Sequence, residues 1–237
     1  MSLFGEAHAP NIADVGSLES LRLAGEAYRS IGIERVTNEQ LSDTDTGASL
    51  EAAVATDLDT RLVQLDDHRL WQVRRGGLAS NYSQFQHLGE LQRLLDQQPT
   101  LRATVGHDYQ VRTDVYVGLP GPIAGGAQFL HAAISCKWTI RSDRVQNVRH
   151  EFNTLVRSRR GRLPHLVLVT AEPLPSRVIS IARGTGEVDA VYHLLFDELT
   201  KAVAGSASVR QVQAWEEMLS QGRLKPYDSL AIDLTQS

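Results

Sequence analysis

Apolar residues recur at every third or fourth position through much of the first hundred residues, which is the spacing of amphipathic helices. This pattern predicts helices over residues 17–31, 47–66 and 81–97. The same spacing returns over residues 143–160, where two arginines occupy the last turn and Gly161 marks the expected end. The N-terminal part of the chain is therefore expected to be mostly helical.

In the middle of the chain the pattern changes to alternation, which is typical of a strand with one buried face. Over residues 111–117, Val115 and Val117 face one way and Asp114 the other. The Gly- and Pro-rich residues 119–127 have the composition of a loop that turns the chain back on itself. We therefore expect a hairpin, with its second strand in the residues that follow.

That second strand is expected over residues 129–140, where alternation separates a core face from a polar edge. Cys136 faces the core, whereas Ser135 and Lys137 lie on the polar edge. If the two strands pair, Asp114 shares a face with Ser135 and Lys137.

The C-terminal half contains a continuous apolar run at residues 163–170, as expected of a strand buried on both faces at the centre of a sheet. Further elements are predicted after it: a short helix over 177–183, a strand over 188–192, and helices over 193–203 and 208–221. The whole pattern predicts an α/β fold with a mixed sheet flanked by helices. We expect a single domain over residues 1–237, divided into a mostly helical part (1–105), a core (106–205) and a C-terminal helix and tail (206–237).

Composition narrows the setting in which such a protein works. The 237 residues are 42% hydrophobic and include one cysteine, Cys136, so no disulfide forms within the chain. Neither a signal peptide nor a membrane span is expected, and a reducing cytoplasm suits this composition. The eight histidines lack the spacing of a zinc site, so any metal is expected to be bound by oxygen ligands.

Charge is distributed unevenly along the chain. Residues 137–162 hold eight Lys and Arg against two acidic residues, a local charge of +6 in a chain of formal net charge −4. The rest of the chain therefore sums to −10, which argues against binding of polyanions by bulk charge. The basic residues are concentrated in one segment that follows Lys137.

Asp114 and Lys137 supply the minimum for metal-assisted cleavage of a phosphodiester, namely a carboxylate for the metal and a cation to orient water. The common form of this motif has a second acid two residues before the lysine, where this chain has Ser135. Glu151, at the flank of the apolar stripe of the helix predicted over 143–160, could replace it. Each residue alone is also compatible with an ordinary surface charge or ion-pair partner.

Arg141, Asp143 and Arg144 are candidates for reading DNA bases. An arginine matches the O6 and N7 of guanine, and an aspartate accepts from the N4 of cytosine. The alternative is a solvated helix start with Asp143 as its N-terminal cap.

Taken together, these motifs resemble one family, the NgoMIV-like Type II restriction endonucleases that cut sites with a central CCGG. The resemblance spans roughly the C-terminal half of the chain. It rests on Ser135, Lys137, Thr139, Arg141–Arg144, Gln146, Asn147, Glu151, Arg160–His165, Glu172–Arg177, Gly184–Gly186 and Val191–His193.

The resemblance implies a restriction-endonuclease-like, PD-(D/E)xK fold with Asp114, Lys137 and Glu151 in the active site. Ser135 would stand where other nucleases carry the second acid. Two Mg²⁺ per active site are implied, bound by Asp114, Glu151 and the backbone carbonyl of Cys136.

It also implies the residues that recognise DNA and the partners. Arg141 and Arg144 would bind the guanines of the CCGG core, Asp143 the cytosines, and Arg177 the outer base pair. A further acid from the N-terminal helix belongs to such sites, and Glu51, after Gly47–Leu50, matches it best.

The implied enzyme is a homodimer that assembles into a homotetramer, leaves four-base 5′ overhangs, and shares a prokaryotic cytoplasm with a protecting DNA methyltransferase. The chain departs from the family in having Thr113 where a proline is common, and in a shorter N-terminal part. Two alternatives remain, a structure-specific or repair nuclease of the same fold and a DNA-binding protein without catalysis.

Overall fold

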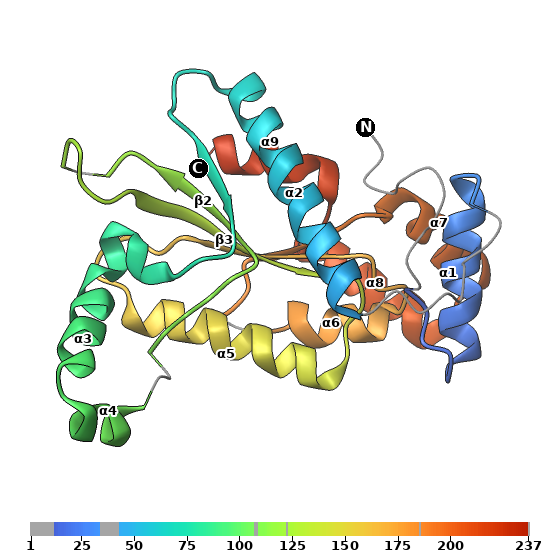
Figure 1. Cartoon of the computed structure of the whole chain (residues 1–237). Coiled ribbons are helices and arrows are strands. Elements are labelled where there is room, and N and C mark those ends of the chain that lie inside the picture. Colours follow the sequence, from blue (N-terminus) through green and yellow to red (C-terminus); the bar gives the residue numbers. More distant parts are fainter. Residues whose placement is uncertain (1–11, 34–42, 107–108, 122, 185, 237) are drawn as a thin grey trace.

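The computed structural model describes residues 12–33, 43–106, 109–121, 123–184 and 186–236. For residues 43–46 and 142–144 it describes the backbone only. A six-stranded sheet lies between two layers of helices (Figure 1). Among the described residues, none of the helices has the length and apolar character needed to cross a membrane.

The strands follow one another across the sheet in the order of the sequence. They are β1 (Gln72–Arg75), β2 (Val115–Leu119), β3 (Phe129–Lys137), β4 (His165–Thr170), β5 (Ala190–His193) and β6 (Leu224–Pro226). The first three pair antiparallel and β3 to β6 pair parallel, so the sheet is mixed. Consequently the carboxyl ends of β3, β4 and β5 lie at the same edge as the start of β2.

Helices cover both faces of this sheet. They are α1 (Leu18–Ser30), α2 (Asp43–Leu65), α3 (Gln86–Asp96), α4 (Pro99–Val105), α5 (Ser142–Ser158), α6 (Pro175–Ala182), α7 (Phe196–Ser206), α8 (Val209–Ser220) and α9 (Leu230–Thr235). Figure 1 shows α2 (cyan) crossing one face of the sheet and α5 (yellow) running along the other.

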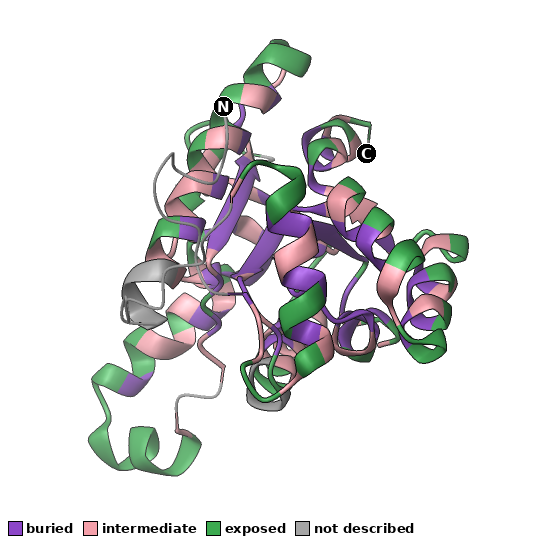
Figure 2. Ribbon diagram, turned by 90° about the vertical axis from the view of Figure 1, so that its right-hand side faces the viewer, coloured by how far each residue is buried: buried purple, intermediate pink, exposed green. Residues whose placement is uncertain are grey.

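Each face of the sheet has its own hydrophobic core. Leu58 of α2 and Leu230 of α9 belong to the core that includes Ile134, and Phe152 of α5 belongs to the core that includes Ala133. Figure 2 shows the strands buried between the helices, whereas α4 at the periphery contributes no buried residue. Burial of apolar surface on both faces of the sheet therefore supplies the main driving force for this architecture.

The structure confirms the mixed sheet, the hairpin of β2 and β3, and the central position of the apolar strand at residues 163–170, observed as β4. The predicted polar edge of the second hairpin strand is wrong. Ser135 is fully buried, because the helix layer containing α5 covers that face of β3. The predicted strand over 129–140 ends at Lys137.

The first hairpin strand also differs, since it begins at Val115 and not at residue 111. The reason lies in Tyr116, whose hydroxyl accepts a hydrogen bond from the N–H of Thr113 (2.9 Å) and donates one to the carbonyl of Val111 (3.3 Å). These bonds, together with the one that the carbonyl of Val111 accepts from the N–H of Ala79 (3.1 Å), use backbone groups that would otherwise join the ladder of β2.

Several elements were not expected from the sequence. The part predicted as mostly helical (1–105) contributes the edge strand β1 and the short helix α4, and residues 206–237 contain β6 and α9 in addition to α8, which corresponds to the helix predicted over 208–221. The helix predicted over 143–160 spans Ser142–Ser158, and the one over 193–203 starts later, at Phe196. Short edge strands such as β1 and β6 carry too few apolar residues to show a period.

Candidate active site

Asp114 immediately precedes β2, and its backbone is fixed by the neighbouring strand. The N–H of Gly76, just beyond the end of β1, donates to the carbonyl of Asp114 at 2.8 Å. Gly76 has φ +65°, a left-handed conformation that glycine adopts without strain. On the other side, the hydroxyl of Tyr116 holds Thr113. Asp114 is thus held on both sides at the edge of the sheet.

The carboxylate of Asp114 is bonded directly to β3. Its Oδ2 accepts from the Nζ of Lys137 at 2.6 Å, from the N–H of Cys136 at 2.7 Å and from the Oγ of Ser135 at 3.1 Å. The antiparallel register, with Val115 opposite Ile134, places these groups together. The expectation that Asp114 shares a face with Ser135 and Lys137 is therefore confirmed.

Two further carboxylates approach this pair from opposite helix layers, Glu151 from α5 and Glu51 from α2. Burial raises the pKa of Glu151 to about 7, with Lys137 opposing the shift and Asp114 adding to it. Burial also raises the pKa of Glu51, and Asp114 adds to that shift, whereas Lys137 and Arg75 oppose it. Glu51, Asp114, Glu151 and Lys137 thus form one electrostatic group, called here the cutting cluster.

The cutting cluster has the donor chemistry of a site for a hard divalent cation. Its three carboxylates are partly desolvated, and two of them are harder to ionise than an ordinary glutamate, so added positive charge would stabilise them. Within the described part of the chain, no three His, Cys, Asp or Glu side chains already stand close enough to hold a metal. The fit to such an ion therefore rests on the chemistry of the oxygen donors and on the raised pKa of Glu51 and Glu151.

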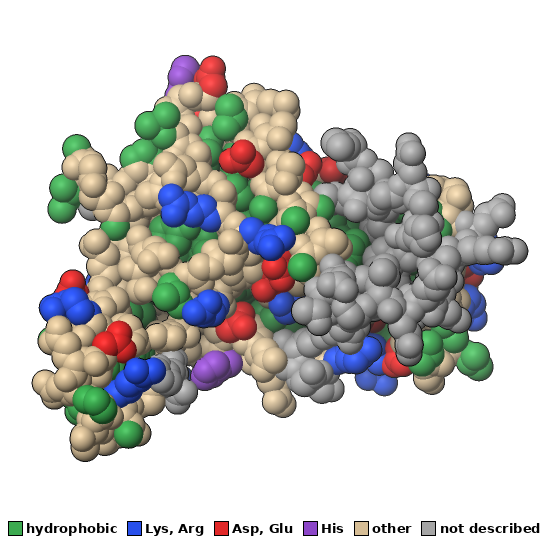
Figure 3. Space-filling view, in the orientation of Figure 1, with side chains coloured by type: hydrophobic (Ala, Val, Ile, Leu, Met, Phe, Trp, Pro, Cys, Tyr) green, Lys and Arg blue, Asp and Glu red, His purple; other side chains and the backbone are tan. Residues whose placement is uncertain are grey.

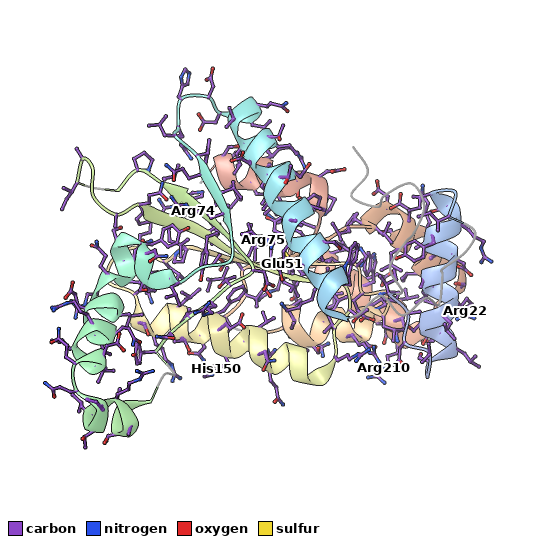
Figure 4. All side chains as sticks on the ribbon, in the orientation of Figure 1. Arg22, Glu51, Arg74, Arg75, His150 and Arg210 are labelled. Atoms are coloured by element: carbon purple, nitrogen blue, oxygen red, sulfur yellow. The ribbon has the colours of Figure 1, made fainter. Side chains whose placement is uncertain are left out.

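Arg75, on β1, is a neighbour of the cutting cluster that the sequence did not reveal. Its side chain is exposed, and its Nη1 donates to the carbonyl of Ala48 on α2 at 3.4 Å. Figure 4 shows Arg75 beside Glu51, and Figure 3 shows basic side chains next to acidic ones near the middle of the same face. The only sequence signal for this position is the double arginine before Gly76 and Gly77, because the strand β1 shows no hydrophobic period.

The adjacent Arg74 differs from Arg75 in the face it occupies. Alternation along β1 puts the two side chains on opposite faces, and Arg74 interacts electrostatically with Tyr82 instead of Glu51. Arg74 is also exposed. The edge strand therefore offers one arginine to the cutting cluster and one to the opposite face.

The predicted base-reading residues lie at the starts of two helices. Arg141 is exposed and is the N-cap residue of α5, so the alternative that Asp143 caps this helix is wrong. Asp143 and Arg144 follow in the first turn, but their side chains lie outside the described residues. Arg141 follows Lys137 by four positions, so the predicted reading segment begins directly beyond the cutting cluster.

Arg177, in the first turn of α6, is held between two carboxylates. Its Nη2 donates to Oδ2 of Asp14, and its Nη1 lies 3.9 Å from Oε2 of Glu172. The pKa of Asp14 is lowered, first by the backbone N–H of Gly16 and then by Arg177, with a smaller effect of Arg141. Asp14 thus links Arg177 electrostatically to Arg141.

Comparisons with known proteins show the family to which this chain belongs. Residues 2–126 and 121–236 match the family model described as NgoMIV restriction enzyme. The chain is 35% identical over 253 aligned residues to the Type II restriction enzyme NgoMIV of Neisseria gonorrhoeae, covering 94% of this chain and 88% of the relative. A solved structure of the restriction endonuclease PspGI in complex with substrate DNA aligns over 89% of this chain and 70% of the PspGI chain, with 12% sequence identity and a TM-score of 0.40. The resemblance seen in the C-terminal half is confirmed by the first two matches, and the chain belongs to the NgoMIV family of Type II restriction endonucleases.

Proposed function

We propose that this endonuclease hydrolyses duplex DNA at a palindrome with a CCGG core, using Mg²⁺ and leaving 5′-phosphate and 3′-hydroxyl ends. As a restriction endonuclease it binds double-stranded DNA and uses a divalent metal. The observation that carries the proposal is the carboxylate of Asp114, bonded to Lys137 and Ser135 and flanked by Glu151 and Glu51.

In the proposed mechanism, the residues that would hold Mg²⁺ are Asp114 and Glu151, together with the backbone carbonyl of Cys136. Bound there, two Mg²⁺ per site would neutralise charge that develops on the phosphate and make a bound water more acidic. Lys137 would orient the attacking water or help its deprotonation, in the second case because the positive charge of the ammonium stabilises the hydroxide while the proton leaves to solvent. Its bond to Asp114 (2.6 Å) keeps its ammonium beside the metal-binding carboxylate.

Ser135 and Glu51 have supporting roles in the proposed mechanism. The Ser135 hydroxyl donates to Asp114 at 3.1 Å and so helps to fix the orientation of that carboxylate, in the place of a second acid. Glu51 lies in the electrostatic range of Asp114 and Lys137, and we assign it an outer role at the metal site.

For sequence recognition we propose that Arg141 and Arg144 bind the guanines of CCGG, that Asp143 accepts from the cytosines, and that Arg177 reads the outer base pair. One such set per subunit, doubled by a two-fold axis, would cover both halves of a palindrome. We therefore propose a homodimer as the minimal unit and a homotetramer of two dimers that acts on two sites. A cognate DNA methyltransferase in the same prokaryotic cytoplasm would protect the host.

Digestion of a large plasmid, followed by sequencing of the fragment ends, tests the proposal. We expect discrete fragments whose ends share a CCGG core, with cleavage in Mg²⁺ and none in excess chelator. Fragments without a common sequence would support a structure-specific nuclease instead. Comparing plasmids with one and two copies of the site tests the two-site tetramer, which predicts faster cleavage of the plasmid with two.

A further inference from the structure

Glu172 is a buried glutamate for which the proposed mechanism has no use. It lies just beyond the end of β4, and none of its surface is exposed. Both carboxylate oxygens are occupied. Oε2 accepts the N–H of Ile140 at 2.8 Å, and Oε1 accepts the N–H of Leu174 at 3.1 Å.

These two amides sit at the starts of the two helices that carry the proposed base-reading residues. Ile140 directly precedes Arg141, the N-cap residue of α5, and Leu174 is the N-cap residue of α6. The same Oε2 lies 3.9 Å from Nη1 of Arg177. One side chain therefore joins the start of α5, the start of α6 and the guanidinium of Arg177.

The main chain of Glu172 is anchored as well. Its N–H donates to Oγ1 of Thr170 at 3.2 Å, and its carbonyl lies 3.0 Å from Nε2 of His193. Because Nδ1 of His193 accepts the N–H of Leu195 and burial lowers the pKa of His193 to about 4, this neutral ring donates from Nε2. Glu172 is thus fixed to the carboxyl ends of both β4 and β5.

From this geometry we propose that Glu172 is a positioning residue for sequence recognition, setting the placement of Arg141 and its neighbours relative to Arg177. The proposal rests on the base-reading roles proposed above. Two amide donors converge on one buried point, and a carboxylate satisfies both because each oxygen accepts. Base reading needs hydrogen-bond geometry within a few tenths of an ångström, so loss of this link should affect discrimination before it affects chemistry.

The substitution Glu172→Gln separates these effects with little change in shape. Its amide keeps one acceptor but turns an NH₂ group toward the second backbone N–H, which leaves a buried donor unsatisfied. The helices keep other contacts, such as Nη2 of Arg149 on α5 with the carbonyl of Ser180 on α6 (2.6 Å). The cutting cluster is unchanged, so kcat at saturating DNA should be retained while KM rises.

The matched control is Asp189→Asn at the opposite end of β4. Oδ2 of Asp189 accepts the N–H of Leu166 at 2.8 Å, so this variant makes the same carboxylate-to-amide exchange at a backbone N–H, but away from the reading helices and with an amide oxygen that can still accept the bond. Binding would be measured in Ca²⁺ with two duplexes, the site obtained from plasmid ends and the same duplex with one core base pair changed. Melting temperatures of all variants would be recorded in parallel.

We expect Glu172→Gln to reduce the ratio of the two affinities about tenfold, mainly by weakening the cognate duplex, and Asp189→Asn to leave the ratio unchanged. Glu172→Asp, which keeps the charge on a shorter side chain, should fall between them. A wild-type ratio in folded Glu172→Gln, an equal loss in Asp189→Asn, or failure of both Glu172 variants to fold would overturn the proposal. The unsubstituted enzyme tests the proposed function separately, because that function fails if the wild type does not discriminate between the duplexes.

Discussion

The cutting cluster and the proposed base-reading residues, called here the reading region (Arg141, Asp143, Arg144 and Arg177), are built in different ways. In the cutting cluster, side chains from β3 and the start of β2 bond directly to one another, with acids from α2 and α5 on either side. The proposed reading residues instead extend from the first turns of α5 and α6, whose backbones Glu172 ties together. The register of the sheet thus determines the first site, whereas a single buried carboxylate aligns the two parts of the second.

This difference has an electrostatic counterpart. Burial raises the pKa of Glu51 and Glu151 in the cutting cluster and so opposes their ionisation, which means that added positive charge would stabilise the cluster. Arg177 in the reading region already has carboxylate partners, Asp14 and Glu172. Added positive charge would therefore stabilise the first site, whereas the arginine of the second is already neutralised by internal carboxylates.

The largest effect is expected from substitution of Lys137, which should reduce the rate of cleavage without changing the binding of DNA. Lys137→Ala removes the cation proposed to orient the attacking water or to favour its deprotonation, and the rate of cleavage should fall about 10²- to 10⁴-fold. Binding of the cognate duplex in Ca²⁺ should be preserved, because the reading helices keep their contacts. Single-turnover cleavage and equilibrium binding measure the two properties. Cleavage at the wild-type rate would exclude Lys137 from the mechanism.

Substitution of Asp143 is expected to have the opposite result, a loss of sequence discrimination. Asp143→Ala leaves cytosine amino groups without an acceptor and should cost about 1–3 kcal/mol of discrimination for each cytosine that this carboxylate binds. Competition between a CCGG duplex and a duplex with one changed core base pair measures this quantity. Discrimination equal to that of the wild type would show that the cytosines are read by another residue.

The cutting cluster was the more predictable of the two regions. Alternation in the two hairpin strands is a local signal, and it is sufficient to predict that Asp114 lies beside Ser135 and Lys137. The burial of Ser135 was not predictable in the same way. It depends on how the helix layer with α5 packs over β3, which is a tertiary effect.

Glu172 and Arg75 show what sequence patterns miss. In the sequence, Glu172 looks like the first polar residue of a loop after an apolar strand, yet it is fully buried, and its carboxylate accepts the N–H of the nearby Leu174 and that of Ile140, which is remote in the sequence. Arg75 belongs to a four-residue edge strand with only one apolar residue, which shows no period. Both residues gain their significance from neighbours that are remote in the sequence.

A smaller effect is expected at the rim of the cutting cluster, where Arg75 could neutralise a DNA phosphate. Arg75→Ala should weaken duplex binding and flatten the slope of log K against log salt by about 0.9, the value for one phosphate contact. Arg74→Ala on the opposite face of β1 is the matched control and should change the slope less. Equal changes in both variants would indicate a general effect of edge charge.

The smallest expected effect concerns the stability of the folded protein. It tests whether the buried charge of Glu151 destabilises the cutting cluster when no cation is bound. The pKa of Glu151 is raised to about 7 in the folded protein, and its ordinary value is 4.5. Between these values the unfolded chain releases this proton and the folded chain keeps it, so the contribution of Glu151 to stability falls as pH rises through 7. Glu151→Gln removes this penalty and should stabilise the metal-free protein at pH 8.

Because Glu151 is only partly buried, solvent screening reduces the expected gain to about 1 kcal/mol, or about 2–4 °C in melting temperature. Thermal unfolding in chelator should show the gain at pH 8 and its decline toward pH 5, where the glutamate is protonated in the fold. Glu216→Gln, at an exposed position on α8, is the control and should show no such pH-dependent gain. A Glu151→Gln variant less stable than the wild type at pH 8 would mean that Lys137 compensates the buried charge of Glu151 fully. In that case the acids of the cutting cluster would be neutralised by internal partners, as Arg177 is in the reading region.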